Sequence, residues 1–309
     1  MRRLILGRLA IVVPTLLAAA SLVFALLHLV PGDPVEMMIG ENAQPAARSE
    51  LRSRLGLDLP IPEQYATWIT NAARGNLGTS IRSGRPVAAI VCDRVGATVA
   101  LALAACAVAI IAGVALGSLA ATMYGSRVDR AALLASTALW VTPSFWLGPM
   151  LVLVLSVALG LLPVAGSGDA AHLVLPALTL GAAMSGVLAR MTRASLLEAF
   201  SDDFVRTARA KGASPLRVLL VHALPNAATP LVSVIGLQFG AVLAGSVVTE
   251  TIFAWPGLGR LVVEAIQARD YPVVQGAVLA IATATVLVNL ATDIVHIVVD
   301  PRSRDAEQE

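Results

Sequence analysis

Long stretches without a single charged residue recur along this chain of 309 residues. Six uninterrupted stretches of 20 or more residues contain no Asp, Glu, Lys or Arg: 9–32, 95–126, 131–168, 170–189, 218–249 and 271–292. About 20 apolar residues in a helix span a bilayer core. Backbone polar groups in lipid must pair within the protein, which favours helices. The sequence therefore predicts an all-α integral membrane protein with six transmembrane helices.

The composition excludes several other classes of protein. Only 14% of the residues are charged and 57% are hydrophobic, whereas about 25% of a soluble domain is charged. The net charge of +2 offers no general electrostatic attraction for nucleic acid. The one lysine, Lys211, is followed by Gly212, so the chain has no Gly-Lys-Ser/Thr loop of a P-loop ATPase.

The first charge-free stretch has two possible interpretations. Arg2, Arg3 and Arg8 precede it, and three alanines at 18–20 could imitate the cleavage site of a signal peptide. Apolar sequence nevertheless continues to Leu29, which is long enough to span a bilayer. We therefore expect residues 1–32 to form a cytoplasmic tip and an uncleaved first transmembrane helix.

Basic residues predict the orientation of the helices, because cytoplasmic flanks are enriched in Arg and Lys. Thirteen basic residues fall on one side of the predicted membrane, in the N-terminus, the loop near 127–130, the loop 190–229 and the C-terminal tail 300–309. The short loop 162–173 on the other side has none. Both termini are therefore predicted to be cytoplasmic.

The segment 33–94 is predicted to lie outside the membrane, before a five-helix core at 95–299. Residues 44–55 and 62–74 have the pattern of short amphipathic helices, and glycines at 75, 78 and 84 indicate turns. Two interpretations stay open for this segment. It could be a cap over the helix bundle, or a docking surface for an extracytoplasmic partner.

The cytoplasmic loop 190–229 is too long and too patterned for a simple connector. Ser201 is a plausible N-cap, acidic residues follow in the first turn, and Arg206 and Arg209 precede Gly212, as expected for a helix with favourable charges at both ends. Pro215 suits the start of a second helix, which we expect Pro225 to end. Alone, this pattern also fits a helix lying on anionic lipid.

Several motifs together resemble one family of membrane proteins. They are Leu-Leu-His-Leu-Val-Pro-Gly-Asp-Pro at 26–34, Phe-Val-Arg-Thr-Ala-Arg-Ala-Lys-Gly at 204–212, His-Ala-Leu-Pro-Asn at 222–226, Glu-Thr-Ile-Phe-Ala-Trp-Pro-Gly-Leu-Gly-Arg at 250–260 and Arg-Asp-Tyr-Pro at 269–272. This set resembles the dipeptide/oligopeptide branch of the permeases of ATP-binding-cassette (ABC) importers. It is similar to the first permease of such a pair. Arg206, Thr207 and Ala208 stand where the general family pattern has Glu-Ala-Ala.

The resemblance implies a fold, partners and a mechanism. The fold would be the type I, MetI-like permease bundle in a bacterial cytoplasmic membrane. The partners would be a second homologous permease, two ATPase subunits that use ATP and Mg, and an extracytoplasmic binding protein; this chain itself would bind no cofactor. A cytoplasmic loop helix would couple ATP hydrolysis to alternating access for peptides. The residues expected to contact the ATPase are Phe204, Arg206, Thr207, Ala208, Arg209, Ala210, Lys211 and Gly212.

Polar residues in or beside the last two stretches are candidates for lining the transport pathway, because such residues are costly in lipid. They are Gln238, Ser246, Thr249, Glu250, Asn289 and Asp293. Asn289 and Asp293 share a helix face, being four residues apart. A structural role near the inner end of the helix stays open for Asp293.

Small residues and missing motifs complete the picture. Gly-x-x-x-Gly at 113–117 and 236–240 allows close helix packing, within a bundle or between subunits. The four histidines are scattered, and neither His-Glu-x-x-His nor Gly-x-Ser-x-Gly occurs. We therefore predict no catalytic or metal site. Two alternatives to the ABC permease remain: a stand-alone ion- or proton-coupled carrier, and an intramembrane enzyme.

Overall fold

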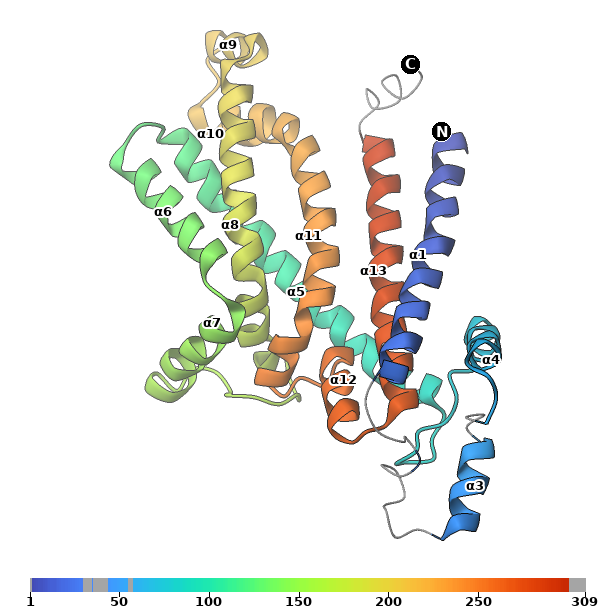
Figure 1. Cartoon of the computed structure of the whole chain (residues 1–309). Helices are drawn as coiled ribbons and strands as arrows, with labels where there is room; N and C mark the ends of the chain where they lie inside the picture. The colour runs from blue at the N-terminus through green and yellow to red at the C-terminus, as the bar shows by residue number, and fades with distance from the viewer. Residues whose placement is uncertain (1, 30–34, 36–43, 55–57, 300–309) are drawn as a thin grey trace.

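The computed structural model describes residues 2–29, 35, 44–54 and 58–299, and helices dominate these residues (Figure 1). Four helices are long and apolar enough to cross a membrane on their own. They are α5 (Val87–Thr122), α8 (Ala171–Ser201), the continuous helix Pro215–Ile252 that contains α11 (Leu224–Ile252), and α13 (Tyr271–Val299). α1 (Arg2–Leu29) contains a shorter apolar stretch, Ala10–Ala25. Predictions for residues 30–34, 36–43, 55–57 and 300–309 lie outside the described residues.

The third charge-free stretch forms a broken element and not one continuous helix. α6 (Arg127–Val141) is followed by α7 (Ser144–Leu151) and a π-helical turn, η1 (Val152–Ala158), at an angle of 106°. Pro143 explains the break, because it has no N–H to continue the ladder of α6 and disfavours helical backbone in the residue before it. Thr142 is accordingly extended, with ψ 121°.

The predicted external helices are present as α3 (Pro45–Arg54) and α4 (Ile61–Ala73). α4 packs across the end of α1. The Tyr65 hydroxyl lies 2.7 Å from the Ser21 hydroxyl, and the Tyr65 and Phe24 rings meet edge to face with centroids 5.3 Å apart. Aromatic contacts of this geometry add to the stabilisation from burial, so they fasten the external segment to α1.

α8 is the central helix and packs against α5, α6, α7 and α11. The core between α5 and α8 includes the buried side chains of Leu101, Ala105, Met184 and Leu188. Both Gly-x-x-x-Gly spacings serve packing within the chain. A Cβ on Gly117 would lie 2.4 Å from the backbone oxygen of Ala189 in α8.

The second spacing brings α11 against α13. A Cβ on Gly236 would overlap the Thr292 side chain, and one on Gly240 would lie 2.6 Å from Asn289 Oδ1. Small residues that face a neighbouring helix let the two backbones approach closely. Between the two alternatives left by the sequence, these four glycines therefore serve the bundle of a single chain.

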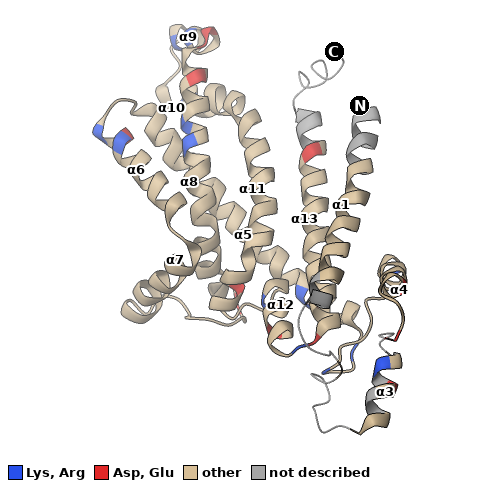
Figure 2. Cartoon of the chain, viewed as in Figure 1, with Lys and Arg blue, Asp and Glu red and all other residues tan. Residues whose placement is uncertain are grey.

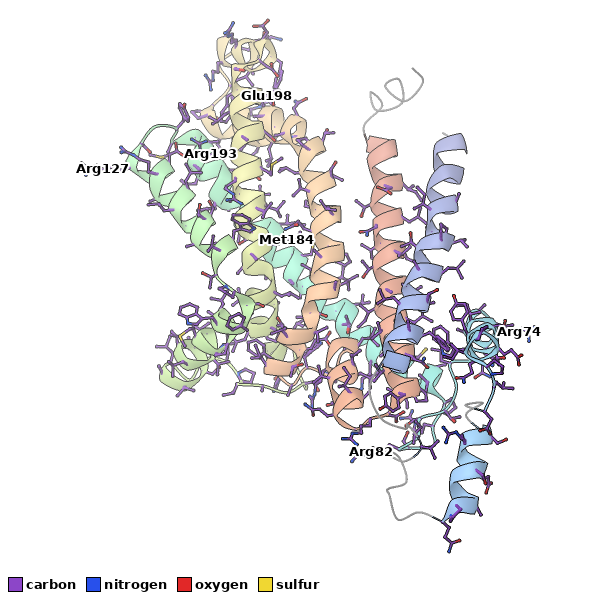
Figure 3. All side chains as sticks on the ribbon, in the orientation of Figure 1. Arg74, Arg82, Arg127, Met184, Arg193 and Glu198 are labelled. Carbon is purple, nitrogen blue, oxygen red and sulfur yellow. The ribbon has the colours of Figure 1, made fainter. Side chains whose placement is uncertain are left out.

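The helices are arranged so that the molecule has two distinct ends. α9 (Asp203–Ala210), the first turn of α1 and the last turn of α13 lie at one end, whereas α3, α4 and α12 (Leu258–Gln267) lie at the other (Figure 1). Arginine and lysine residues lie on α9 and on the nearby ends of α6 and α8 (Figure 2). Arg127, Arg193 and Glu198 lie toward this end, and Arg74 and Arg82 lie toward the opposite one (Figure 3).

The carboxylate of Asp169 caps the start of α8, at the same end of the molecule as α12. Asp169 Oδ1 accepts hydrogen bonds from the backbone N–H groups of Ala171 and His172 and lies 2.8 Å from the His172 ring. The hydrogen bond from the His172 side chain holds the pKa of Asp169 below its ordinary value. A carboxylate at this position satisfies donors that have no partner within the helix.

Candidate functional site

α9 is a short amphipathic helix that projects beyond the end of α8. Val205 and Ala208 are three residues apart and form its buried face, packed against Val218 with Phe200 and Ala213 beside them. Val205 has no exposed surface and Ala208 is 7% exposed. Packing, and not helix propensity, holds so short a helix in place.

The opposite face of α9 is exposed and basic. The exposed residues of α9 and of the two positions after it are Asp203, Phe204, Arg206, Thr207, Arg209, Ala210, Lys211 and Gly212. Arg206 forms an ion pair with Asp203 at 3.2 Å, and Arg209 lies over the Phe200 ring at 6.0 Å. Exposed pairs of this kind contribute little to stability. The face therefore presents guanidinium groups that remain open to an acidic or carbonyl-bearing surface.

Seven of the eight predicted contact residues share this exposed face, and Ala208 does not. Ala208 is covered by Val205 and Val218 of the same chain, so in this structure it seats the helix instead of offering a surface. The predicted N-cap at Ser201 is also displaced. Ser201 ends α8 and donates to Glu198 O at 2.7 Å, and Asp202 is the N-cap of α9.

The end of α9 has the geometry expected from Gly212. Its φ is +80°, which favours glycine. The Gly212 N–H donates to Arg209 O at 3.0 Å, and the Ala213 N–H donates to Ala208 O at 3.1 Å. These two bonds form a Schellman motif, so Gly212 reverses the chain sharply between α9 and the next helix.

The second predicted loop helix does not end before the membrane, and that prediction is wrong. α10 (Pro215–Arg217), capped by the Ser214 hydroxyl, continues through a π-helical turn, η2 (Val218–Ala223), into α11. Pro225 lies in the first turn of α11 and Pro230 lies within it. The wider turn just before Pro225 accommodates a residue that has no N–H to donate.

The predicted pathway residues divide into two groups. Ser246, Thr249 and Glu250 are buried within the chain, at 1%, 0% and 0% exposure, so they line no open surface in this structure. Gln238 and Asp293 are partly exposed, and Asn289 is exposed on the face of α13 toward Gly240. The residues are therefore not brought together into one site.

Glu250 instead joins three helices in a buried polar network. Its Oε1 accepts from the Thr98 hydroxyl of α5 at 2.8 Å and from the Ser246 hydroxyl at 3.2 Å. The Leu258 N–H, at the start of α12, donates to Thr98 Oγ1 at 2.7 Å. A buried carboxylate is stable only when its oxygens are hydrogen-bonded. The sequence indicated Glu250 only as a candidate for lining the pathway, and no local pattern pointed to Thr98.

A second buried carboxylate ties the external segment to the helix bundle. Asp270 accepts from the Ser80 hydroxyl at 2.5 Å and from the Ile81 N–H at 3.2 Å. It lies just before α13, and the Val274 N–H donates to its backbone oxygen. In the sequence, only its place in the Arg-Asp-Tyr-Pro motif indicates a role for Asp270. The pairing partner is 190 residues away.

No group of three or more His, Cys, Asp or Glu side chains in the described part of the chain is arranged to hold a metal ion. The buried carboxylates of Glu250 and Asp270 are engaged by hydroxyl and backbone donors of this chain. The arrangement as a whole offers a packed membrane bundle with one exposed basic helix at its end.

Comparison with known proteins decides the family. The family model "Binding-protein-dependent transport system inner membrane component" matches residues 113–305, and the corresponding N-terminal model matches residues 1–102. The chain belongs to this permease family. Membership favours an ABC importer permease over the stand-alone carrier and the intramembrane enzyme.

Curated relatives match the permease over nearly its full length. The dipeptide transport system permease protein DppB of Escherichia coli (strain K12) is 42% identical, and the alignment covers 98% of this chain and 99% of the relative. The di/tripeptide permease DppB of Pseudomonas aeruginosa (strain UCBPP-PA14) is also 42% identical, over 96% and 97% of the two chains. The glutathione permease GsiC of Escherichia coli O6:H1 is 42% identical, over 97% and 98%.

A solved structure supports the fold. A chain of the MetNI methionine ABC transporter, in an inward-facing conformation, aligns with a TM-score of 0.57 and 19% identity. The alignment covers 68% of this permease and 96% of that chain. The protein is thus a type I ABC importer permease, a multi-pass inner-membrane component that is not itself an enzyme.

Proposed function

We propose that this permease imports short peptides and that α9 transmits ATP-driven movement to it. One observation carries the coupling role: α9 is seated by Val205 and Ala208 while Arg206 and Arg209 stay exposed beyond the end of the membrane helices. A helix seated in this way transfers a push or pull to the bundle. Its open guanidinium groups suit charge-assisted hydrogen bonds with a partner.

The substrate class rests on the relatives. Their names give dipeptides, di/tripeptides and glutathione, which are all short peptides or peptide-like compounds. Identity of 42% over nearly the full length supports the same class of substrate for this chain. Gln238, Asn289 and Asp293, which retain exposed surface, stay the better candidates for contact with it among the predicted pathway residues.

The proposed assembly contains four kinds of component besides lipid. They are this permease, a second homologous permease, two ATPase subunits that use ATP and Mg, and an extracytoplasmic binding protein. In this assembly the end of the bundle with α9 is cytoplasmic, together with both termini, which agrees with the arginines gathered there (Figure 2). The segment 33–94 then faces the binding protein.

Binding alone would not move the permease. A partner shifts a conformational equilibrium only when it binds the two states with different affinity. The ATPase pair must therefore hold α9 differently in its ATP-bound and nucleotide-free states. α9 would carry that difference into α8 and into the helix Pro215–Ile252, because it contacts both.

The test is retention of the ATPase subunits by the purified transporter. Replacing both exposed arginines, Arg206→Glu with Arg209→Glu, should lower retention at least tenfold, since each charge-assisted hydrogen bond contributes about 1.5–3 kcal/mol. Arg127→Glu is the control, because Arg127 is exposed at the same end but lies on α6. Normal ATPase retention by the double variant would exclude the coupling role of α9.

A further inference from the structure

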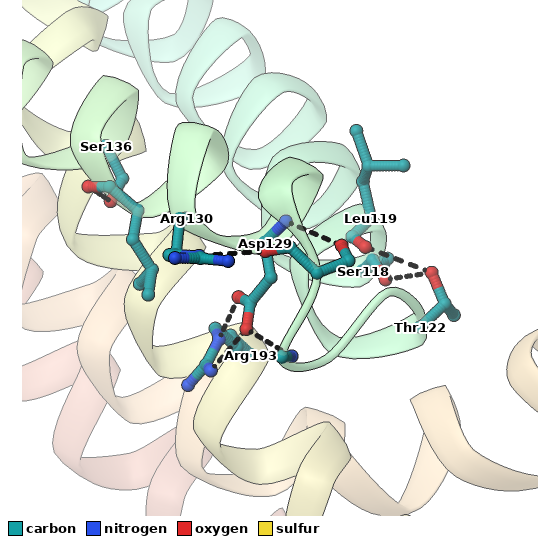
Figure 4. Close-up of polar contacts among 10 residues, drawn as sticks. Ser118, Leu119, Thr122, Asp129, Arg130, Ser136 and Arg193 are labelled. Carbon is teal, nitrogen blue, oxygen red and sulfur yellow. Dashed lines mark hydrogen bonds and ion pairs between the residues drawn. The ribbon is translucent and has the colours of Figure 1, made fainter.

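A buried ion pair joins two cytoplasmic segments that are far apart in the sequence. Asp129, in the first turn of α6, is 3% exposed. The Nε of Arg193 donates to its Oδ1 at 2.7 Å, and Nη2 donates to its Oδ2 at 2.9 Å (Figure 4). This two-bond geometry fixes the guanidinium and the carboxylate in one plane, so α6 and α8 are held in one relative position.

The same carboxylate organises the turn between α5 and α6. The Gly125 N–H donates to Asp129 Oδ2 at 2.9 Å, and the Asp129 N–H donates to the Ser126 hydroxyl at 3.2 Å. The Arg193 guanidinium also lies 5.3 Å from the centre of the Tyr124 ring. Arg193 therefore holds the whole turn 124–126 as well as the first turn of α6.

Close backbone packing surrounds this ion pair. A Cβ on Gly117 of α5 would lie 3.1 Å from the backbone nitrogen of Arg193. A Cβ on Gly186 of α8 would lie 2.3 Å from the backbone oxygen of Ser136 in α6. Arg190 adds a second contact with α6, over the Trp140 ring at 4.4 Å. At this level α5, α6 and α8 thus form one body, with the ion pair at its cytoplasmic edge.

The ion pair lies close to the proposed ATPase contact. Arg193 precedes the end of α8 at Ser201 by eight residues, about 12 Å along a helix. α9 follows α8 and also rests on Val218, which lies in the π-helical turn before α11. α9 therefore sits between the body formed by α5, α6 and α8 and a separate helix with a widened turn.

We propose that Asp129 and Arg193 are positioning residues that make α5 and α6 follow α8 when the ATPases move α9. This inference rests on the proposed coupling role of α9. The movement would reach the far end of the bundle, because α6 leads into α7, where a Cβ on Gly148 would lie 3.2 Å from Phe253. Without the ion pair, α8 would move with α9 while the turn 124–126 lagged behind.

The experiment measures a labelled dipeptide transported per ATP hydrolysed by the complete transporter in liposomes, with its binding protein. The variants are Asp129→Asn, Arg193→Gln and the double variant that carries both changes. The double variant is included because each single change leaves the charge of the other residue buried without its partner. We expect each variant to retain its ATPase subunits, and we expect the double variant to unfold at a temperature close to that of the wild type. Transport per ATP should nevertheless fall about fivefold or more, the usual lower range for coupling between sites. The double variant should lose no more than the worse single one, since the two residues act as a unit.

Arg127→Gln is the matched control, because it removes a charge two residues from Asp129 without touching the network. A wild-type ratio of transport to ATP in the double variant would overturn the inference, as would fully additive losses. Neither result would affect the role of α9, which is tested separately by the retention of ATPases in the Arg206 and Arg209 variants. Loss of the ATPases from the double variant would also overturn the inference, because positioning would then not be its function.

Discussion

Glu250 Oε2 accepts a hydrogen bond from the backbone N–H of Arg260, ten residues further along the chain, at 3.0 Å. The carboxylate thus serves the first turn of α12 from the preceding helix. The chain between them must pass very close to it, since a Cβ on Gly257 would lie 2.2 Å from Oε1. Gly257 is therefore explained by the space that Glu250 occupies, whereas Gly259 is explained mainly by Val247, whose Cα would lie 2.5 Å from an added Cβ.

Removing this carboxylate should destabilise the permease. Glu250→Ala leaves the Thr98 hydroxyl and the Arg260 N–H without their acceptor, and we expect a loss of about 2–4 kcal/mol. Thermal unfolding of the detergent-solubilised protein measures the loss. Thr251→Ala is the control, because Thr251 is exposed and bonds only within its helix. Equal unfolding temperatures for the two variants would contradict a structural role of Glu250.

A second prediction concerns the contact between α5 and α8. Gly117→Ala would press a methyl group against the backbone oxygen of Ala189, and backbone cannot turn aside as a side chain can. We expect a loss of about 1–3 kcal/mol. Gly96→Ala lies in the same helix with nothing within 4 Å of the new Cβ, so it should be neutral or stabilising by up to about 1 kcal/mol. The same sign for both variants in thermal unfolding would count against this packing.

The third prediction tests the turn after α9. Gly212→Pro cannot adopt φ +80° and loses the N–H that bonds Arg209 O. We expect transport per ATP to fall while the chain still inserts into the membrane. Gly212→Ala meets no neighbour but keeps an unfavourable φ, so its effect should be smaller, about 1–2 kcal/mol of strain. A transport ratio unchanged in Gly212→Pro would exclude a role for this turn in coupling.

The fourth prediction concerns the external segment. Asp270→Asn weakens the hydrogen bonds to Ser80 and Ile81, so the backbone around Arg82 should open locally more often. We expect the rate of cleavage by trypsin after Arg82 to rise about tenfold. Limited proteolysis of the folded protein measures the rate of cleavage after Arg82. Asp93→Asn provides the comparison, because its ion pair with Arg85 is exposed. Equal rates in the two variants would refute the anchoring role of Asp270.

Hydropathy predicted most of the membrane helices, because a span needs only length and apolar composition. It could not predict the 106° break after α6, since a proline in an apolar stretch can either kink a helix or end it. Pro143 ends one, whereas Pro225 and Pro230 are accommodated in a continuing helix. Local sequence does not distinguish these outcomes; the packing of neighbouring helices does.

The candidate site was predictable in part for a similar reason. Charges and Gly212 define α9 locally, and the structure leaves Arg206 and Arg209 exposed, while their contact with an ATPase stays a prediction. The inward position of Ala208 depends on Val218, and the role of Glu250 depends on Thr98, 152 residues earlier. Ser126 and Asp129 have a capping spacing that could have marked the start of α6, but nothing local indicated Arg193.

The Ser80–Asp270 contact has a consequence for how such chains can be recombined. Ser80 belongs to the part matched by the N-terminal family model and Asp270 to the part matched by the other. The two parts are therefore not interchangeable modules joined by a flexible link. A chimera that takes its first hundred residues from a relative must inherit a hydroxyl at position 80, or the buried carboxylate will lose its shortest hydrogen bond and keep only backbone N–H donors from residues 81 and 82.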